Sequence, residues 1–409
     1  MVRLPAAPIV LAALVTIAAT ARTVAAQDTD CNAPAKDAIV NLEMPGRPFE
    51  PVATADGCWI FVTLTQRDGG SGGAVAVVRR TGGSLSIART IPLKDAPTGA
   101  VLTHDGRLLV VADGGYLAFL DAARLERGDD DPVLGYMGSG SPVGFIYATV
   151  TSDDRYLIAS AERAAALVVI DLDSARAGGF KDRGVVAKLD VGNAPIAVTL
   201  SADDRFLFTT SEVARPEWNW PRSCRPENRN VRGDAPNHSQ GAIIVFDFSL
   251  VLRDPSQGSI ARIPAGCSPV RLVLSPDGAV AYVSARGDNT LLAFDAQRLA
   301  SADGAHSSLG QVEVGVAPVG IAVVDGGRGV VVTSSNRFGG GAGDHQPLTV
   351  VDASRLRNGG LAVVGTIPAG AFPRELRVTA DGRTLLATNF GSRSLEMIDL
   401  ARVAATTAH

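Results

Sequence analysis

One short phrase recurs seven times along this chain: an apolar segment, a tight acidic or glycine turn, and a second apolar segment. In chain order the turns are Asp56-Gly57, Asp105-Gly106, Asp153-Asp154, Asp203-Asp204, Asp277-Gly278, Asp325-Gly326 and Asp381-Gly382. Most successive turns lie about fifty residues apart, and a period of this size indicates a repeat architecture. The chain therefore stacks equivalent small units and does not form a single α/β core.

The fifth repeat shows the structure of the unit most clearly. Pro269 opens it, and apolar segments at 270–275 and 279–285 flank the turn. A third strand is expected at 290–295 and a fourth at 311–314. Four short strands separated by turn residues form one blade of a β-propeller. The sequence therefore predicts an all-β fold, a seven-bladed β-propeller with four antiparallel strands in each blade.

The number of strands predicts how the ring closes. The seventh repeat, from Pro373 to about residue 403, supplies only three strands, and one orphan strand is expected at 37–44. We expect this N-terminal strand to complete the last blade, because a closed ring leaves no free sheet edges. The predicted propeller domain covers 37–403, between a short segment at 27–36 and a tail at 404–409.

Aspartates also recur at the expected ends of the third strands, at Asp121, Asp171, Asp247, Asp295, Asp352 and Asp399. Carboxylates can bind metals, but a metal site would occur once and not in blade after blade. Aspartate side chains accept hydrogen bonds from nearby backbone N–H groups. We interpret these residues as turn formers and predict neither a metal site nor a cofactor.

The N-terminus has the pattern of a secretory signal peptide. Arg3 supplies a positive start, residues 6–19 are apolar, and small residues at 24–26 precede the expected cleavage. Removing residues 1–26 takes the formal net charge from −4 to −6. A mildly acidic chain repels phosphate backbones, so we expect no nucleic-acid partner. We predict a secreted or periplasmic monomer with no membrane span after cleavage.

The four cysteines predict two disulfides, because an even count in an oxidising compartment favours pairing. In a four-stranded blade, the loops joining strands one to two and three to four share one side of the ring, here called the turn face. The loops joining strands two to three and successive blades share the other side, the loop face. Cys31 and Cys58 fall on the turn face, and Cys224 and Cys267 on the loop face. The expected pairs are therefore Cys31–Cys58 and Cys224–Cys267.

Two phrases carry a family resemblance. Ser275-Pro276-Asp277-Gly278 with Ala281-Tyr282-Val283-Ser284, and Leu385-Leu386-Ala387-Thr388-Asn389, resemble the YVTN-type repeat of YncE-like and lactonase-like seven-bladed propellers. The resemblance covers nearly the whole mature chain, but its motifs belong to hairpins and not to an active site. It implies an exported propeller that binds a ligand or partner. For lactonase relatives it implies hydrolysis of a sugar lactone or cyclic ester.

The loop face is the expected site, because loops on a rigid scaffold carry function. An insertion at 212–239 holds Trp218, Trp220 and His238, and a second at 336–346 holds Asp344 and His345. Polar residues at loop starts and strand entrances give the candidate ligand-binding set: Gln66, Arg67, Asp113, Glu162, Arg163, Glu212, Arg271, Arg286, Asn336, Arg337, Arg374, Glu375 and Asn389. Arginines facing one opening can bind an anion, or these charges pair with one another on a solvated rim.

Three functions remain open at this point. The first is a non-catalytic module that binds a small polar or anionic ligand, or a protein, through the loop face. The second is a lactone hydrolase with His238 or His345 as base, although no G-x-S-x-G elbow or Ser-His-Asp set supports it. The third is a protein-docking platform with Trp218 and Trp220 as aromatic anchors.

Overall fold

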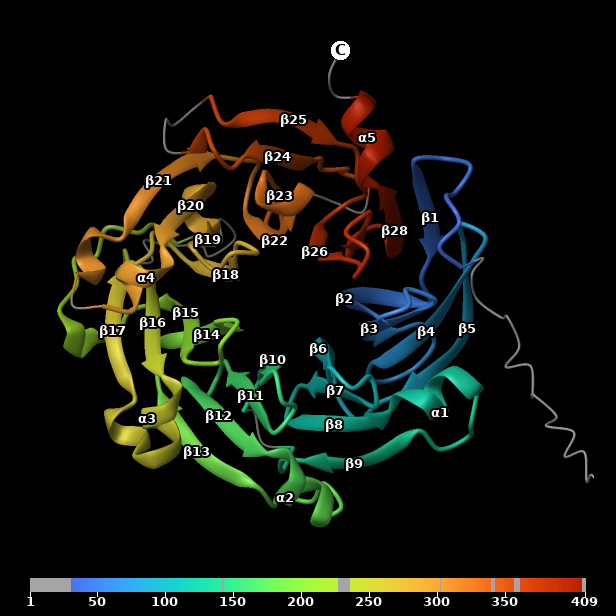
Figure 1. Ribbon diagram of the computed structural model, residues 1–409, viewed down its shortest axis with the longest axis horizontal. Helices are drawn as coiled ribbons and strands as arrows, with labels where there is room; N and C mark the ends of the chain where they lie inside the picture. Colours follow the sequence, from blue (N-terminus) through green and yellow to red (C-terminus); the bar gives the residue numbers. More distant parts are fainter. Residues whose placement is uncertain are drawn as a thin grey trace, which may run out of the picture.

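The computed structural model describes residues 31–140, 143–226, 236–301, 303–339, 343–356 and 361–406. Over these ranges the chain forms seven four-stranded antiparallel sheets, which stand as blades around a central channel (Figure 1). The predicted seven-bladed all-β propeller is confirmed. The predicted leader, residues 1–26, lies outside the described residues.

In the described ranges, no helix combines the length and the apolar character needed to cross a membrane.

The first strand of each blade lines the channel, and the next strands follow outward in chain order (Figure 1). Blades one to three are β2 (Gly46–Ala53), β3 (Trp59–Arg67), β4 (Ala74–Thr81) and β5 (Ser84–Pro92); β6 (Pro97–Leu102), β7 (Leu108–Asp113), β8 (Tyr116–Asp121) and β9 (Val133–Met137); and β10 (Phe145–Val150), β11 (Tyr156–Ala161), β12 (Ala166–Asp171) and β13 (Val185–Asp190).

The remaining blades repeat this order. Blades four to six are β14 (Asn193–Leu200), β15 (Phe206–Val213), β16 (Ala242–Asp247) and β17 (Ser259–Pro264); β18 (Pro269–Leu274), β19 (Val280–Ala285), β20 (Thr290–Asp295) and β21 (Ser308–Glu313); and β22 (Pro318–Val324), β23 (Gly329–Ser334), β24 (Leu348–Asp352) and β25 (Val363–Ile367). Blade seven joins β26 (Pro373–Val378), β27 (Thr384–Asn389) and β28 (Ser394–Asp399) to the N-terminal β1 (Ile39–Glu43).

Neighbouring blades pack through apolar faces. One hydrophobic cluster of buried residues lies between each adjacent pair, including the pair formed by blade seven and blade one. Between blades two and three, for example, the rings of Phe119 and Phe180 stack with centroids 4.4 Å apart. Burial of these faces holds the blades together, because each sheet alone would expose apolar residues on both sides.

A ring of hydroxyl groups connects the blades near the channel. In six blades, a Ser or Thr of the second strand accepts from an N–H of its own first strand and donates to a carbonyl of the next blade's first strand. These residues are Thr63, Ser160, Thr210, Ser284, Thr333 and Thr388. Thr388 closes the ring by donating to the Phe49 carbonyl at 2.7 Å. In blade two Ala112 takes the position, and the Thr98 hydroxyl of the first strand donates instead.

The recurrent acidic turns close the first hairpin of most blades. In blade five, Asp277 accepts from the Ser275 hydroxyl and from the Ala279 N–H, and these bonds lower the pKa of Asp277. Gly278 follows with φ of 68°, in the left-handed region that suits glycine. In blades three and four, Asp154 and Asp204 occupy this position and also accept from the neighbouring turn.

The aspartates that end the third strands cap short helices. Asp121, Asp171, Asp247 and Asp295 each accept a backbone N–H at the start of a helix. These helices are α1 (Ala122–Arg127), α2 (Leu172–Ala177), α3 (Phe248–Arg253) and α4 (Ala296–Leu299). Asp399 does the same for α5 (Leu400–Thr406). The interpretation of these carboxylates as local structural acceptors is confirmed.

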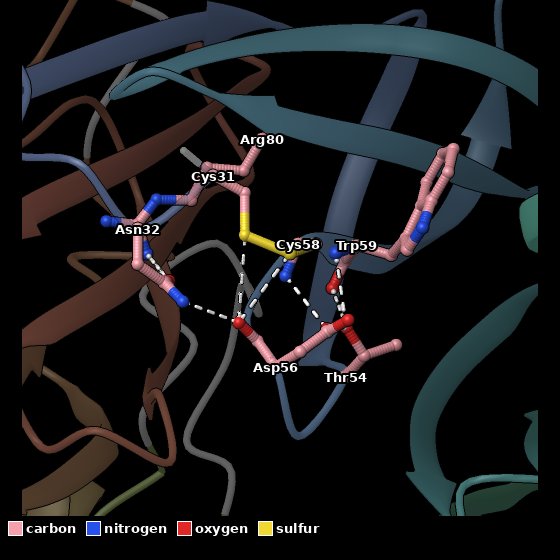
Figure 2. The surroundings of a disulfide bond; sticks show 7 residues. All are labelled: Cys31, Asn32, Thr54, Asp56, Cys58, Trp59 and Arg80. Carbon is pink, nitrogen blue, oxygen red and sulfur yellow. Dashed lines mark hydrogen bonds between the residues drawn. A yellow bond between two sulfur atoms is a disulfide. The ribbon is translucent and has the colours of Figure 1, made fainter. Parts of the chain in front are cut away.

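The N-terminal segment latches the ring, as predicted. β1 pairs antiparallel with β28, from Ile39 opposite Ile398 to Glu43 opposite Ser394. The Cys31–Cys58 disulfide joins the segment before β1 to the first turn of blade one (Figure 2). Beside it, the Asn32 side chain donates to the Asp56 carbonyl at 2.7 Å and accepts from Arg80 at 3.1 Å. The second predicted disulfide, Cys224–Cys267, is also present.

Candidate functional site

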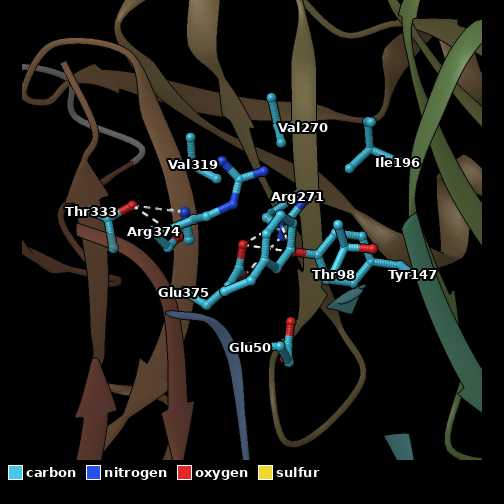
Figure 3. Close-up of polar contacts among 12 residues, drawn as sticks. Glu50, Thr98, Tyr147, Ile196, Val270, Arg271, Val319, Thr333, Arg374 and Glu375 are labelled. Carbon is cyan, nitrogen blue, oxygen red and sulfur yellow. Dashed lines mark hydrogen bonds and ion pairs between the residues drawn. The ribbon is translucent and has the colours of Figure 1, made fainter. Parts of the chain in front are cut away.

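A buried charged cluster lies where the first strands of blades three, five and seven converge (Figure 3). Arg271 Nε donates to Glu375 Oε2 at 3.0 Å, and Arg271 Nη2 contacts both Glu375 Oε1 and the Tyr147 hydroxyl. Tyr147 also donates to Glu375 Oε1 at 2.6 Å. The guanidinium carbon of Arg271 lies 3.8 Å from the centre of the Tyr147 ring. The cluster links three blades across the channel.

The hydroxyl ring explains why these side chains share one level of the channel. Arg271, Glu375 and Tyr147 are the residues whose N–H groups donate to Ser284, Thr388 and Ser160, respectively. Glu50 occupies the same position in blade one, where its N–H donates to Thr63. The equivalent residues of blades four and six are Ala197 and Gly320, which carry no charge.

A second ion pair joins blades one and seven. Arg377 Nε donates to Glu50 Oε1 at 2.6 Å. The Glu50 side chain is 1% exposed, whereas half of the Arg377 side chain is exposed. Burial raises the pKa of Glu50 to about 7, against the opposing field of Arg377. Arg377 therefore faces open space while its partner does not.

Arg374 lies beside this cluster among aromatic rings. Its guanidinium carbon is 3.8 Å from the centre of the Phe49 ring and 5.6 Å from those of Phe372 and Phe390. Phe49 belongs to an apolar cluster in the channel with Tyr147, Ile196, Val270 and Val319. Figure 3 shows the last four of these residues together with Arg271 and Arg374. Burial lowers the pKa of Arg374 to about 9. The aromatic faces stabilise the cation, since they carry negative charge density.

The predicted charges at the loop face form a network in which oppositely charged residues lie close together. Arg286 and Glu212 make a bidentate pair, with Nη1–Oε1 2.9 Å and Nη2–Oε2 2.8 Å. Burial and the nearby carboxylate of Glu212 raise the pKa of Glu162. Arg337 stacks on the ring of Phe338, and Arg163 is exposed. The structure thus brings part of the predicted set together, with its main pair already formed.

Three other predicted residues have local structural partners. Asp113 is fully buried and accepts from the N–H groups of Lys94 and Asp95, although burial still raises its pKa to about 6. Asn336 donates to Asp344 at 2.7 Å within the second insertion. Arg67 donates to a carbonyl of its own hairpin.

The longer insertion is fixed to the propeller at several points. The Cys224–Cys267 disulfide ties it to the connection after blade four. Cys224 and His238 exchange two backbone hydrogen bonds, of 2.9 and 3.0 Å, across the insertion. Trp218 and Trp220 lie with ring centroids 5.3 Å apart and pack against the core between blades three and four. Residues 227–235 lie outside the described ranges.

The histidines of the two insertions engage the backbone. His238 Nδ1 lies 2.9 Å from the Ser239 carbonyl, and His345 Nδ1 lies 3.2 Å from the Ala369 carbonyl. Each ring keeps Nε2 for other chemistry if Nδ1 donates these bonds. Among the described residues, no group of three or more His, Cys, Asp or Glu is arranged to hold a metal ion.

Asn389 lies in a buried polar group with Glu396, a residue that the sequence did not indicate. It is fully buried in β27, donates to Ser394 at 3.1 Å and hydrogen-bonds Glu396 of β28. Glu396 is 3% exposed and one of its carboxylate oxygens has no partner in the described part of the chain. Burial raises the pKa of Glu396 from 4.5 to about 7.

Glu396 gives a pH-dependent contribution to stability. Its folded-state pKa lies above the unfolded value, so ionisation favours the unfolded chain and stability is lost as pH rises from about 5 to about 8. At ~1.4 kcal/mol per pKa unit, Glu396→Gln is expected to reduce this loss by on the order of 2 kcal/mol. Denaturant unfolding at about pH 5 and about pH 8 measures this loss of stability in the wild type and the variant. Glu43→Gln, an exposed carboxylate on β1, is the control, and equal pH dependence in wild type and Glu396→Gln would refute the assignment.

Sequence reasoning missed Glu50, Tyr147 and Arg377. An alignment of the repeats contains the signal that could have found two of them. Glu50 and Tyr147 stand at the same position of the repeat as Arg271 and Glu375, whereas blades four and six have the small residues Ala197 and Gly320 there. It also missed a cavity of about 390 Å³ in the channel. His104, Ser152 and Asp204 from the first turns line this cavity, so it opens on the turn face and not on the loop face.

Comparisons with known proteins identify the fold and no closer relationship. No protein-family model and no curated protein matches the chain. A solved structure of Kuenenia stuttgartiensis hydrazine synthase is similar with a TM-score of 0.61 and 15% identity, over 88% of this chain and 97% of that one. The Swd1 (Cps50) β-propeller domain of Myceliophteria thermophila has a TM-score of 0.60 and 11% identity, over 88% and 98%.

At such identities a structural likeness shows the fold alone. The resemblance to the YVTN-type repeat is supported by no family match. Fold and comparisons together place the chain among the seven-bladed β-propellers.

Proposed function

We propose that this protein is an exported, non-catalytic β-propeller that binds a protein partner through its loop face. The observation that carries the proposal is the anchoring of the longer insertion by a disulfide, a backbone bridge and two packed tryptophans. Residues 212–226 and 236–239 are anchored in this way, and anchored residues lose little conformational entropy on binding, so that their contacts contribute more of their energy to affinity. Export is supported by the two disulfides and by the leader-like N-terminus.

The composition of this surface fits a protein partner. Trp and Arg are enriched among residues that dominate binding energy. Here Trp220 lines a hollow of about 500 Å³ with Arg215, Arg222 and His238. Arg222 and Arg225 are exposed beside it. We infer that the partner presents an acidic surface to these arginines.

The test is capture of partners from the extracellular or periplasmic fraction of the source organism, quantified by mass spectrometry. We expect Arg222→Glu/Arg225→Glu to lose the captured partner by tenfold or more, roughly the effect of 1.4 kcal/mol. The matched control is Arg127→Glu/Arg176→Glu, two exposed arginines on α1 and α2 at the turn face. Equal capture by both variants and wild type would contradict the proposal.

The alternative function is a lactone hydrolase, which a turnover assay on the same protein tests. It requires His238 or His345 to act as base through Nε2. Lactone turnover by the wild type that disappears in His238→Ala/His345→Ala would replace the binding function with this activity. We expect no turnover that depends on these residues.

A further inference from the structure

The channel contains a cavity that the loop-face proposal does not use. Its volume is about 390 Å³, and its opening lies among the first turns of the blades. Strand residues of the channel supply an apolar wall that includes Val150, Val198, Leu200, Leu272, Leu274 and Ile321. Tyr147, Arg271, Glu375 and Arg377 supply polar groups from the strands. Further polar side chains come from Thr149 and Thr199 and from the first-turn residues His104, Ser152, Ser201 and Asp204. Apolar walls with a few convergent polar groups are typical of small-molecule sites.

Arg377 is the charged group that this cavity presents to a ligand. Half of its side chain is exposed, although the residue lies in the channel strand β26. Its Nε is held by Glu50 at 2.6 Å, which fixes the plane of the guanidinium. Among the described residues its side chain makes its hydrogen bond through Nε, and the two Nη groups make none. A guanidinium with both Nη groups open matches a carboxylate in a two-point contact.

The other charged residues that line the cavity already have partners, including Asp204 at its opening, which accepts from the N–H and the hydroxyl of Ser152. Arg271 and Glu375 form a buried pair, in which Tyr147 is a third member. Glu50 is the ion-pair partner of Arg377, and its second oxygen is buried without a partner in the described part of the chain. When Glu50 takes up a proton, Arg377 loses its ion-pair partner. An anionic ligand would then supply the missing charge.

We propose that the channel cavity binds a small organic carboxylate with an apolar body, whose carboxylate contacts the two Nη groups of Arg377. The apolar body lies against the strand residues, and the cavity admits the ligand from the turn face. The site is separate from the loop face and does not depend on the function proposed there. Binding is non-covalent, and the one proton that moves is the proton taken up by Glu50.

Proton uptake by Glu50 makes the affinity for the ligand depend on pH. The charged groups that face the Glu50 carboxylate are Arg377 and Glu375 from β26 and Arg271 from β18. Its pKa of about 7 falls between the two conditions chosen for the test. The ionised Glu50 repels the ligand carboxylate, so affinity is greatest below this pKa. It is expected to fall about tenfold from about pH 6 to about pH 8.

Isothermal titration calorimetry with the full mature protein tests the proposal. The probes are benzoate and hexanoate, with benzamide and hexanamide as uncharged controls of similar shape. We expect saturable binding of at least one carboxylate at millimolar concentration or below, and no binding of either amide. Absence of carboxylate binding, or equal binding of acid and amide, would overturn the proposal.

Three variants locate the binding. Arg377→Gln is expected to abolish it, and Arg383→Gln, an exposed arginine of the next turn in the same blade, to leave it unchanged. Thr149→Trp is expected to abolish binding by filling the cavity, since Thr149 lines it and takes no part in the ion pairs. Because this variant leaves Glu50 and Arg377 intact, it remains informative if Arg377→Gln destabilises the fold. Wild-type affinity in Thr149→Trp would place the ligand elsewhere.

Discussion

Replacing Glu375 by Leu is expected to lower the free energy of unfolding by about 3–5 kcal/mol, because it leaves Arg271 buried without its counter-charge. Arg271→Met is expected to cost a similar amount, since it strands Glu375. The triple variant Arg271→Met/Glu375→Leu/Tyr147→Phe removes every polar member of the cluster. Its loss in free energy of unfolding is expected to be much smaller than the sum of the losses in the single variants, because no charged or polar member of the cluster remains buried without its partner. Denaturant unfolding measures all three.

The control for this cycle is an exposed ion pair. Arg328 and Asp325 pair at the surface with side chains 80% and 61% exposed. Arg328→Met is expected to change stability by about 0.5 kcal/mol or less, since exposed pairs contribute little. Additive effects of the substitutions in the buried cluster would show that Arg271, Glu375 and Tyr147 do not act as one unit.

Removing the Cys31–Cys58 disulfide is expected to lower the free energy of unfolding by about 3–5 kcal/mol, because this disulfide closes a loop spanning 27 residues. The Cys224–Cys267 disulfide spans 43 residues and is expected to cost about as much, because the entropy depends only weakly on loop length. Chemical denaturation of the two double Cys→Ala variants measures the losses.

The two disulfides are expected to differ in which strands they protect and not in the size of the stability loss. Without Cys31–Cys58, β1 retains its pairing with β28 but loses the covalent tie to blade one. Amides of β1 and β28 are therefore expected to exchange with solvent faster in this variant alone, which hydrogen exchange detects. Unchanged protection of both strands would show that the disulfide does not latch the ring.

The repeating hairpin made the fold predictable from the sequence. Each turn supplies its own acceptor, as Asp277 does for Ser275 and Ala279, so local chemistry marks every blade. Ser284 and Thr388, the hydroxyl residues of the two YVTN-like phrases, carry the bonds that join one blade to the next. A repeat that encodes both the hairpin and its junction specifies a ring with little ambiguity.

The candidate sites were less predictable, because they depend on contacts between distant blades. Arg271 and Glu375 were expected at the channel mouth, but their pairing across 104 residues depends on the register of two separate strands. Tyr147 lies 228 residues from Glu375 and entered no motif. Arg377 differs from the other charged channel residues in its exposure, which depends on the folded ring: half of its side chain is exposed while that of its partner Glu50 is buried. Exposure inside a channel has no counterpart in a linear pattern.

The two faces of the propeller are chemically distinct. The loop face carries the disulfide-anchored insertion with its tryptophans and exposed arginines. The turn face opens into a cavity with apolar walls and the Arg377 guanidinium. The two proposed binding surfaces share no residues, so each proposal can be tested without disturbing the other.

The most direct test of partner binding is hydrogen exchange on the complex of the mature protein with its captured partner. We predict protection at residues 212–226 and 236–239 and in the second insertion, with unchanged exchange in the first turns of the blades. Protection confined to the turns at 103–106, 151–154 and 201–204 would place the partner on the opposite face and contradict the account.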